Sequence, residues 1–205
     1  AMMVRRGEAD AMICGTYGHY TWHLKHILDI IGTAKNVRQV SAMATLMMGK
    51  GTFFLCDTHV THNPTIEEIV EATLLSAKAV QNFGITPKVA LLSHSNFGSR
   101  DSETALKMRK ATTIIKKQSP SLQIEGELQA DAALDEAIRK RTFPNSQLSG
   151  SANLLIFANV EAANNAFNLL KALGDGVVIG PMLVGAAKTA HIVTPSVNSE
   201  GLTNM

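Results

Sequence analysis

Residues 93–99 have the side chains and the position of an anion-binding loop. The segment Ser-His-Ser-Asn-Phe-Gly-Ser follows an apolar run over 88–93 and precedes a helix expected over about 102–117. In open α/β sheets, ligands bind at the carboxyl ends of the strands, where loop amides and the dipole of the next helix attract negative charge. The same residue types are also ordinary turn and capping chemistry, so both interpretations stay open at this point.

Five of the seven histidines form two groups that could suggest a metal site. His19, His23 and His26 recur at helical spacing, and His59 and His62 lie close together in the chain. A His-Glu-x-x-His pattern is absent, and no carboxylate stands at an evident ligand spacing. We therefore expect no metal, and expect imidazoles that are partly exposed or hydrogen-bonded in the core.

Other catalytic motifs are incomplete or missing. Gly-Thr-Tyr-Gly at 15–18 lacks the third glycine of a dinucleotide-binding fingerprint, and no phosphate-binding Gly-Lys-Ser/Thr loop occurs. A serine hydrolase of the Gly-x-Ser-x-Gly type is also unsupported, because that elbow is absent. Glu125, Glu127 and Asp131 could be paired acids, although acids near a helix start more often complement the helix dipole.

The elements that would position these residues alternate between strands and helices. Strands are expected over 11–14, 37–48, 52–56, 88–93, 154–157 and 177–183, the last of them broken at Gly180-Pro181. Helices are expected over 21–31, 66–83, about 102–117, 131–141 and 161–173, with a capping box at Thr65 and Glu68 and an N-cap at Asn159. This order predicts a three-layer α/β/α fold with a mostly parallel sheet.

Composition excludes several classes of protein. The 205 residues are 45% hydrophobic and 18% charged, which is ordinary for a chain that buries one domain or two small lobes. A net charge of +2 and 5% aromatic residues give neither the basic footprint nor the stacking surface of a nucleic-acid binder. No apolar run is long enough for a membrane span, and no signal peptide opens the chain. The two cysteines, Cys14 and Cys56, are expected to be buried thiols in a reducing compartment, which favours a cytoplasmic protein.

A series of motifs resembles the phosphate acetyl/butyryl-transferase (phosphotransacetylase) family. In chain order they are Val-Arg-Arg-Gly-Glu-Ala-Asp at 4–10, Asp57 with Asn-Pro-Thr at 63–65, Phe-Gly-Ile-x-Pro at 83–87, Val-Ala-Leu-Leu-Ser at 89–93, Glu-Gly-Glu-Leu-Gln-Ala-Asp-Ala-Ala at 125–133, Pro-Asn-Ser at 144–146, Leu-Leu-Ile-Phe-x-Asn at 154–159 and Gly-Pro-Met-Leu at 180–183. Three further segments, 52–58, 94–99 and 191–197, resemble most the phosphotransacetylase-like C-terminal domain of large bacterial NADP-dependent malic enzymes. The resemblance implies a fold similar to isocitrate and isopropylmalate dehydrogenases, with two lobes, a cleft between them and dimerisation through the lobe present. Since the family is longer, residues 1–205 are expected to be the C-terminal part of such a domain, with the N-terminal lobe largely missing.

Two departures from the family pattern concern catalysis. Active members carry Ser-Thr-Lys-Gly in the loop after the buried strand, whereas this chain has Ser-Asn-Phe-Gly at 95–98. Active members also carry Asp-Leu-Ser-Arg-Gly and a following aspartate near the end, and the stretch 193–201 has neither the arginine nor the aspartate. Acetyl transfer needs a deprotonated thiol and a stabilised oxyanion, so the resemblance implies a site that has lost catalysis and kept binding.

The resemblance therefore implies an acetyl-CoA-sensing regulatory domain of a malic enzyme without acetyltransferase activity. No residue is assigned a catalytic or metal-binding role, and acetyl-CoA is expected as a ligand or effector. The residues expected to bind it are Ser95, Asn96, Gly98, Ser99, Arg100, Asn159, Asn164 and Lys188. The expected partners are a second copy, in a homodimer or higher homo-oligomer, and the malic-enzyme catalytic region, with no nucleic acid and no membrane. An active phosphate acetyltransferase and a structural dimerisation module are the alternatives.

Overall fold

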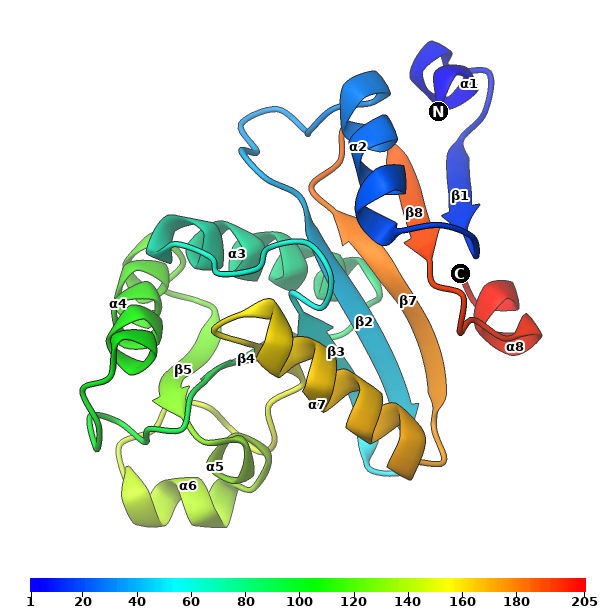
Figure 1. The fold of residues 1–205 in the computed structure, drawn as a ribbon. Coiled ribbons are helices and arrows are strands. Elements are labelled where there is room, and N and C mark those ends of the chain that lie inside the picture. The colour runs from blue at the N-terminus through cyan, green and yellow to red at the C-terminus, as the bar shows by residue number, and fades with distance from the viewer.

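The computed structural model describes residues 1–205 and contains two sheets with helices around them (Figure 1). The strands are β1 (Ala11–Gly15), β2 (Ser41–Met48), β3 (Gly51–Cys56), β4 (Lys88–Leu92), β5 (Gln123–Leu128), β6 (Leu154–Ile156), β7 (Val177–Val184) and β8 (Thr189–Val193). The helices are α1 (Met2–Arg6), α2 (Tyr20–Ile30), α3 (Ile66–Asn82), α4 (Glu103–Gln118), α5 (Ala130–Leu134), α6 (Glu136–Thr142), α7 (Val160–Leu173) and α8 (Ser199–Thr203).

Six strands form the main sheet, in the order β5-β4-β6-β3-β2-β7. β5, β4, β6 and β3 run parallel, and β2 runs antiparallel to both of its neighbours. The sheet is thus mostly parallel, as the alternation of strands and helices predicts. Because the four parallel strands point the same way, their carboxyl ends meet at one edge of the sheet.

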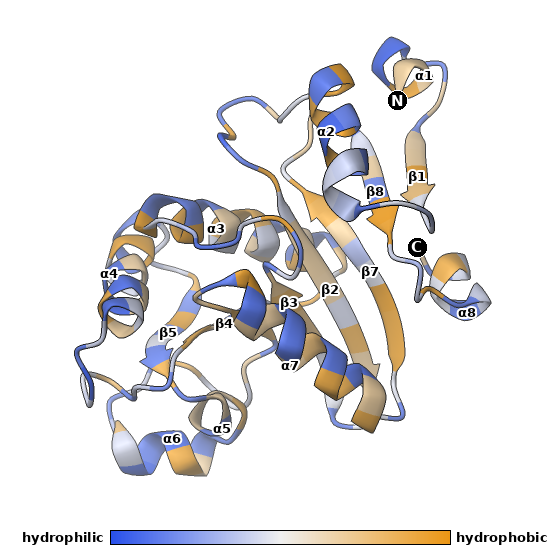
Figure 2. Cartoon of the chain, in the orientation of Figure 1, coloured by the Kyte–Doolittle hydropathy of each residue, from blue (hydrophilic) through white to orange (hydrophobic).

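Apolar side chains on both faces of the main sheet explain why it lies between two layers of helices. Along β4, Val89 and Leu91 belong to one core cluster, whereas Ala90 and Leu92 belong to the other. All four are buried, since successive side chains of a strand point to opposite faces. Figure 2 shows hydrophobic residues along the strands, while the longer helices carry hydrophobic and hydrophilic residues side by side.

Helices supply the other half of each core cluster. Ile69 of α3 lies in the first cluster with residues of α4, and Phe167 of α7 lies in the second with residues of α5. α3 begins at the predicted capping box, in which Thr65 Oγ1 accepts from the Glu68 amide at 3.3 Å and Glu68 Oε2 accepts from the Thr65 amide at 2.7 Å. The predicted three-layer α/β/α architecture is confirmed.

The second sheet consists of the parallel strands β1 and β8, against which α2 packs. Leu183 of β7 belongs to the same small core, which joins this sheet to the main one. β1 ends at Gly15, where an added Cβ would lie 2.0 Å from the carbonyl oxygen of Val193 and where φ is +118°. Only glycine allows the two strands to approach this closely.

Two predicted boundaries are wrong because side chains hold the backbone in another conformation. β2 begins at Ser41 rather than at 37, because the carboxylate of Glu71 accepts from the amides of Arg38 and Gln39, which are then not available to a strand partner. The single helix expected over 131–141 is two short helices. Asp135 between them is extended, and its carboxylate accepts from the first amides of α6.

Two predictions at the end of the chain also differ from the structure. β7 continues through Gly180-Pro181, since a register shift on β2 between Met43 and Thr45 accommodates the irregularity. β8 was not predicted, because its only paired strand is β1, at the other end of the sequence. Local periodicity carries no information on such a pairing.

Two further findings concern expectations from composition. No helix of the structure is both long enough and apolar enough to cross a membrane. Cys56 is buried as predicted, Cys14 is only partly buried, and both are free thiols.

Candidate functional site

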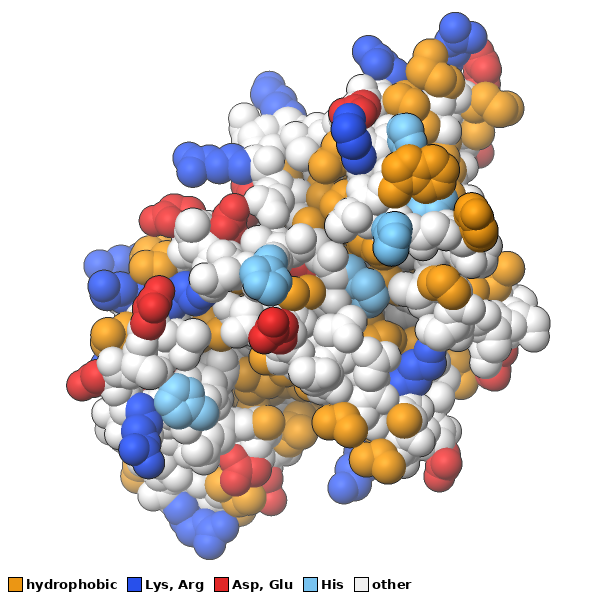
Figure 3. Space-filling model, in the orientation of Figure 1, with side chains coloured by type: hydrophobic (Ala, Val, Ile, Leu, Met, Phe, Trp, Pro, Cys, Tyr) orange, Lys and Arg blue, Asp and Glu red, His pale blue; other side chains and the backbone are white.

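The carboxyl edge of the parallel strands brings four segments together. Residues 57–62 follow β3, residues 93–102 follow β4, Gln129 follows β5, and residues 157–159 follow β6 and lead into α7. Because β6 pairs with both β3 and β4, the segments after these three strands are neighbours. Figure 3 shows histidine side chains near the middle of this face, between the regions of α2, α3 and α7. The candidate site lies along this edge, as expected for an open α/β sheet.

The loop after β4 is built around the carboxylate of Glu127, which is fully buried. Its Oε1 accepts from Ser95 Oγ at 2.8 Å and from the Gly98 amide at 2.8 Å, and its Oε2 accepts from Arg109 Nε at 2.9 Å. Burial alone would raise the pKa of Glu127, but the hydrogen bonds from Arg109, Gly98 and Ser95 outweigh it and lower the pKa to about 2. Glu127 is therefore ionised at neutral pH, and its hydrogen bonds to Ser95 and Gly98 fix the conformation of the loop.

The other polar side chains of this loop bond within it or to Gln129, which follows β5. Ser99 Oγ accepts from the Asn96 amide at 2.9 Å, and the Asn96 side chain exchanges two hydrogen bonds with Gln129 at 2.9 and 2.7 Å. Ser95, which is fully buried, also accepts from the Arg100 amide at 3.0 Å. The guanidinium of Arg100, by contrast, is exposed and forms no hydrogen bond or ion pair. Of the predicted ligands in this loop, Arg100 has the side chain that is free to meet an anion.

Phe97 occupies the third position of the Ser-Asn-Phe-Gly segment, and its ring points into the protein. Its φ is +45°, a conformation that costs energy for a bulky residue. Its ring stacks on Phe143 with centroids 4.4 Å apart and planes 20° apart, and the half-buried Phe97 packs against the second core cluster. The loop thus carries an apolar anchor here and no cation.

Asn159 and Asn164, both predicted to line the cleft, lie on α7 at the same edge. Asn159 Oδ1 caps α7 by accepting from the Ala162 amide at 2.9 Å, as predicted from sequence. Asn159 also lines a polar cavity of about 290 Å³ next to Lys107. Asn164 Nδ2 donates to the carbonyl oxygen of Thr58 at 3.3 Å, which fastens α7 to the loop after β3.

Lys188 is the one predicted ligand that three strands separate from the β4 loop along this edge. It is exposed in the connection between β7 and β8. In the main sheet, β6, β3 and β2 separate β4 from β7. The fold therefore brings together the predicted residues of the β4 loop and α7, and leaves Lys188 outside that group.

Asp57 and His59 are prominent at this edge but were not predicted as site residues. Asp57 accepts four backbone hydrogen bonds of 3.0–3.1 Å, from the amides of Ala42, His59, Val60 and Thr61. Burial nevertheless raises the pKa of Asp57. The signal that could have identified it is an aspartate directly after a buried apolar strand, where a carboxylate can bind the amides of the following turn.

His59 stands where the two sheets meet. Its ring centroid is 4.9 Å from that of Tyr20 on α2 and 6.5 Å from that of Phe167 on α7. Its Nδ1 is 2.8 Å from Thr58 Oγ1. Burial lowers the pKa of His59 to about 4, so the imidazole is neutral at physiological pH. The residue serves as a neutral polar contact between α2, α7 and the loop after β3.

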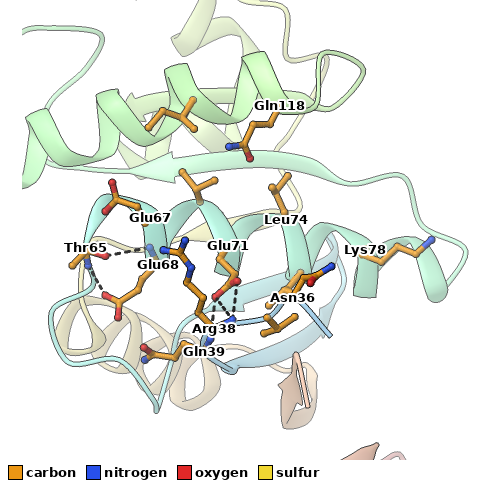
Figure 4. A pocket seen from close by; sticks show the side chains of 14 residues that line it. Asn36, Arg38, Gln39, Thr65, Glu67, Glu68, Glu71, Leu74, Lys78 and Gln118 are labelled. Carbon is orange, nitrogen blue, oxygen red and sulfur yellow. Dashed lines mark hydrogen bonds between the residues drawn. The ribbon is translucent and has the colours of Figure 1, made fainter. Parts of the chain in front are cut away.

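A cavity of about 780 Å³ lies outside this group of residues (Figure 4). It is bounded by α3, α4 and residues 36–39. Its carboxylates mainly hold the chain: Glu71 accepts from the amides of Arg38 and Gln39 at 3.0 Å, and Glu68 completes the capping box. None of the predicted site residues lines this cavity.

No group of three or more His, Cys, Asp and Glu side chains lies close enough together to hold a metal ion. His23, which belongs to the helical histidine group, instead has Nε2 2.6 Å from the carbonyl oxygen of Tyr17.

Comparison with known proteins gives a consistent result at the level of sequence and of fold. The family model described as "Phosphate acetyl/butaryl transferase" matches residues 1–205. The chain is 46% identical to an NAD-dependent malic enzyme of Rhizobium meliloti over 205 residues, covering all of this chain and 27% of that enzyme. It is 34% identical to a phosphate acetyltransferase of Helicobacter pylori over 203 residues, covering 99% of this chain and 39% of that protein. Among solved structures, the EutD phosphotransacetylase from Staphylococcus aureus matches with a TM-score of 0.88 and 27% identity, over 98% of this chain and 62% of that one. The chain thus spans about a quarter of the length of the malic enzymes that it matches.

Proposed function

The chain belongs to the phosphate acetyl/butyryl transferase family, a domain found in malic enzymes and in phosphate acetyltransferases, and from this premise we propose that it is an acetyl-CoA-binding regulatory domain of a malic enzyme. In this proposal the domain binds acetyl-CoA at the carboxyl edge of the parallel strands and has little or no acetyltransferase activity. Its partners are the malic-enzyme catalytic region and a second copy of the domain. The free thiols of Cys14 and Cys56 agree with a cytoplasmic setting.

The observation that carries the proposal is the orientation of Phe97. Where active family members have a lysine, this half-buried ring stacks on Phe143 and packs against the second core cluster, so position 97 offers no cation to a reacting group. The second departure is near the end of the chain, where active members have an arginine and an aspartate. Residues 195–201 of this chain contain neither of them. Losing one donor to a developing oxyanion typically costs ~10²–10³ in rate, and the missing base reduces thiol activation further.

Binding places smaller demands on the site than catalysis does. CoA carries phosphates, which need cations and backbone amides but no group matched to a reacting atom. Arg100 is exposed and unpaired beside a loop that Glu127 and Arg109 hold in one conformation. A preorganised loop with a free guanidinium supports affinity for an anionic ligand, because less side-chain and backbone freedom is lost on binding.

Calorimetric titration of the intact malic enzyme with acetyl-CoA tests the proposal. We expect saturable heat and a change in the rate of malate oxidation on the same concentration scale. Arg100→Gln should weaken binding about threefold to tenfold, the range for one exposed charge-assisted contact, whereas Arg141→Gln on α6 should have no effect. No heat, together with an unchanged rate of malate oxidation, would exclude the regulatory role.

An active phosphate acetyltransferase is the second candidate, favoured by the 34% identity to such an enzyme over nearly the whole chain. It predicts robust formation of acetyl-CoA from acetyl phosphate and CoA in a coupled assay. The regulatory proposal predicts turnover at or near background in the same assay. The two candidates therefore give opposite results in one measurement, whatever the affinity for acetyl-CoA.

A further inference from the structure

The small sheet of β1 and β8 is connected to the main sheet by segments of chain that cross between them (Figure 1). Residues 31–40 lead from α2 to β2, and residues 185–188 lead from β7 to β8. The two segments lie against each other, joined by an isolated bridge between Thr33 and Ala186. A change in the orientation of the small sheet relative to the main sheet would therefore deform both segments together.

Glu71 of α3 fastens the first of these segments to the helical layer of the main sheet. Its Oε1 accepts from the Arg38 amide at 3.0 Å, and its Oε2 accepts from the Gln39 amide at 3.0 Å (Figure 4). The two donors are 33 and 32 residues away in the sequence, so the contact joins separate parts of the fold. Because one carboxylate holds two successive amides, it fixes the direction in which the backbone approaches β2.

No cationic side chain pairs with this carboxylate. Arg38 and Lys78 line the same cavity, but neither side chain takes part in any of the six ion pairs of the protein. The charge of Glu71 therefore acts on fixed backbone amides rather than on a mobile side chain. Hydrogen bonds to an ionised acceptor are stronger than those between neutral groups, so this contact constrains the main chain.

α3 also packs against the second crossing segment. Gly185 has a φ of +89°, and a Cβ at this position would lie 3.0 Å from Leu75 Cδ1 and 3.1 Å from Val37 Cγ1. Leu75 follows Glu71 by one helical turn, so both side chains lie on the same face of α3. One face of α3 thus contacts both segments that connect the two sheets.

The orientation of the small sheet bears on the candidate site, because α2 borders the loop after β3. The ring centroid of Tyr20 on α2 lies 4.9 Å from that of His59 in this loop. We propose that Glu71 is a positioning residue, which fixes the small sheet relative to the main sheet and thereby sets the shape of the site at the carboxyl edge. The effect on acetyl-CoA binding rests on the proposed function, whereas the effect on the orientation of the two sheets does not.

Distance measurement by double electron–electron resonance tests the proposal. One nitroxide replaces Lys25 on α2, which packs on the small sheet, and the other replaces Lys110 on α4, which packs on the main sheet. Both lysines are exposed. Attachment through a ketone-bearing amino acid leaves the two free thiols, Cys14 and Cys56, unmodified.

The wild-type protein should give one narrow distribution of distances. Glu71→Gln should broaden or shift this distribution, because the glutamine side chain has one acceptor oxygen, no charge and an NH₂ group that cannot accept from an amide. Glu67→Gln is the matched control and should behave as wild type, since Glu67 is an exposed glutamate one turn earlier on the same helix. If Glu71→Gln does not fold, Glu71→Asp provides the second variant, because the side chain is then one methylene too short to reach both amides.

Acetyl-CoA titration of the same samples measures the effect on the site. Glu71→Gln should weaken binding by about threefold to tenfold, because binding must then also order the two sheets. An unchanged distance distribution in Glu71→Gln, or an equal change in Glu67→Gln, would overturn the inference, even if Glu71→Gln is less stable in urea. Unchanged acetyl-CoA affinity in a variant with a broadened distribution would exclude the effect on the site. Failure of the wild type to bind acetyl-CoA would count against the proposed function alone, because the distance measurement needs no ligand.

Discussion

Neutralising Glu127 should destabilise the protein through the loop after β4. The pKa of Glu127 falls from 4.5 to about 2 in the folded protein, and each pKa unit corresponds to ~1.4 kcal/mol, which gives an upper value of about 3 kcal/mol. The Arg109 side chain is 34% exposed, so water screens part of the attraction, and we expect Glu127→Gln to cost about 2 kcal/mol at pH 7. For a chain of this size, the melting temperature should fall by about 4–8 °C.

The pH dependence of this loss is the stronger test. A carboxylate whose pKa is depressed on folding stabilises the protein fully above the unfolded pKa of about 4.5, and that stabilisation is lost as the pH falls through about 2. The difference in unfolding free energy between wild type and Glu127→Gln, measured by urea titration, should therefore be constant from pH 7 to about 5 and shrink below it. Asp29→Asn, which breaks the exposed pair with Lys25, should cost less than about 0.5 kcal/mol. A loss below about 1 kcal/mol for Glu127→Gln, or one that does not change between pH 7 and pH 3, would refute the reasoning.

Two further substitutions test other parts of the fold. Gly15→Ala should displace β1 from β8, because the new Cβ would lie 2.0 Å from the Val193 carbonyl oxygen; hydrogen exchange of the β8 amides should accelerate strongly. Gly51→Ala is its control, since φ is also positive there but no atom lies within 4 Å, and equal effects of the two would contradict the steric argument. Asn159→Ala should lower the unfolding free energy by about 1 kcal/mol through loss of the α7 cap, measured by urea titration, whereas Asn168→Ala on the exposed side of α7 should lose less than half of that.

The sequence predicts the features of the fold that depend on neighbouring residues. The capping box at Thr65 and Glu68 and the N-cap at Asn159 each join residues three positions apart, and the structure confirms both. The other strands of the main sheet are likewise visible as apolar runs, but β5, which carries Glu125 and Glu127, was not predicted. β8 fails this test, because its apolar residues form a strand only through pairing with β1.

In the candidate site, too, the sequence predicts what depends on neighbouring residues and misses what depends on distant contacts. The position of the loop after β4 follows from the strand and the helix on either side of it, and this position was predicted. The hydrogen bonds that hold the loop were not predicted. Ser95 follows β4, whereas its acceptor Glu127 lies on β5, 32 residues further along the chain. Consequently, the side chains of Ser95 and Asn96, which the sequence suggests could face a ligand, instead bond Glu127 and Gln129 at the end of β5.

At the two positions where the chain departs from the family pattern, different kinds of contact replace the missing family residues. At Phe97 the missing cation is replaced by packing, since the ring stacks on Phe143 and fixes the loop. At Pro195 the flanking hydroxyls of Thr194 and Ser196 remain, and Lys171 donates to the second of them. Anion recognition depends only on nearby charge and donors, whereas catalysis also requires a base of matched pKa at the reacting atom. A protein with these substitutions can therefore keep its affinity for phosphate-bearing ligands while losing acyl transfer, and this separation is what a sensing role requires.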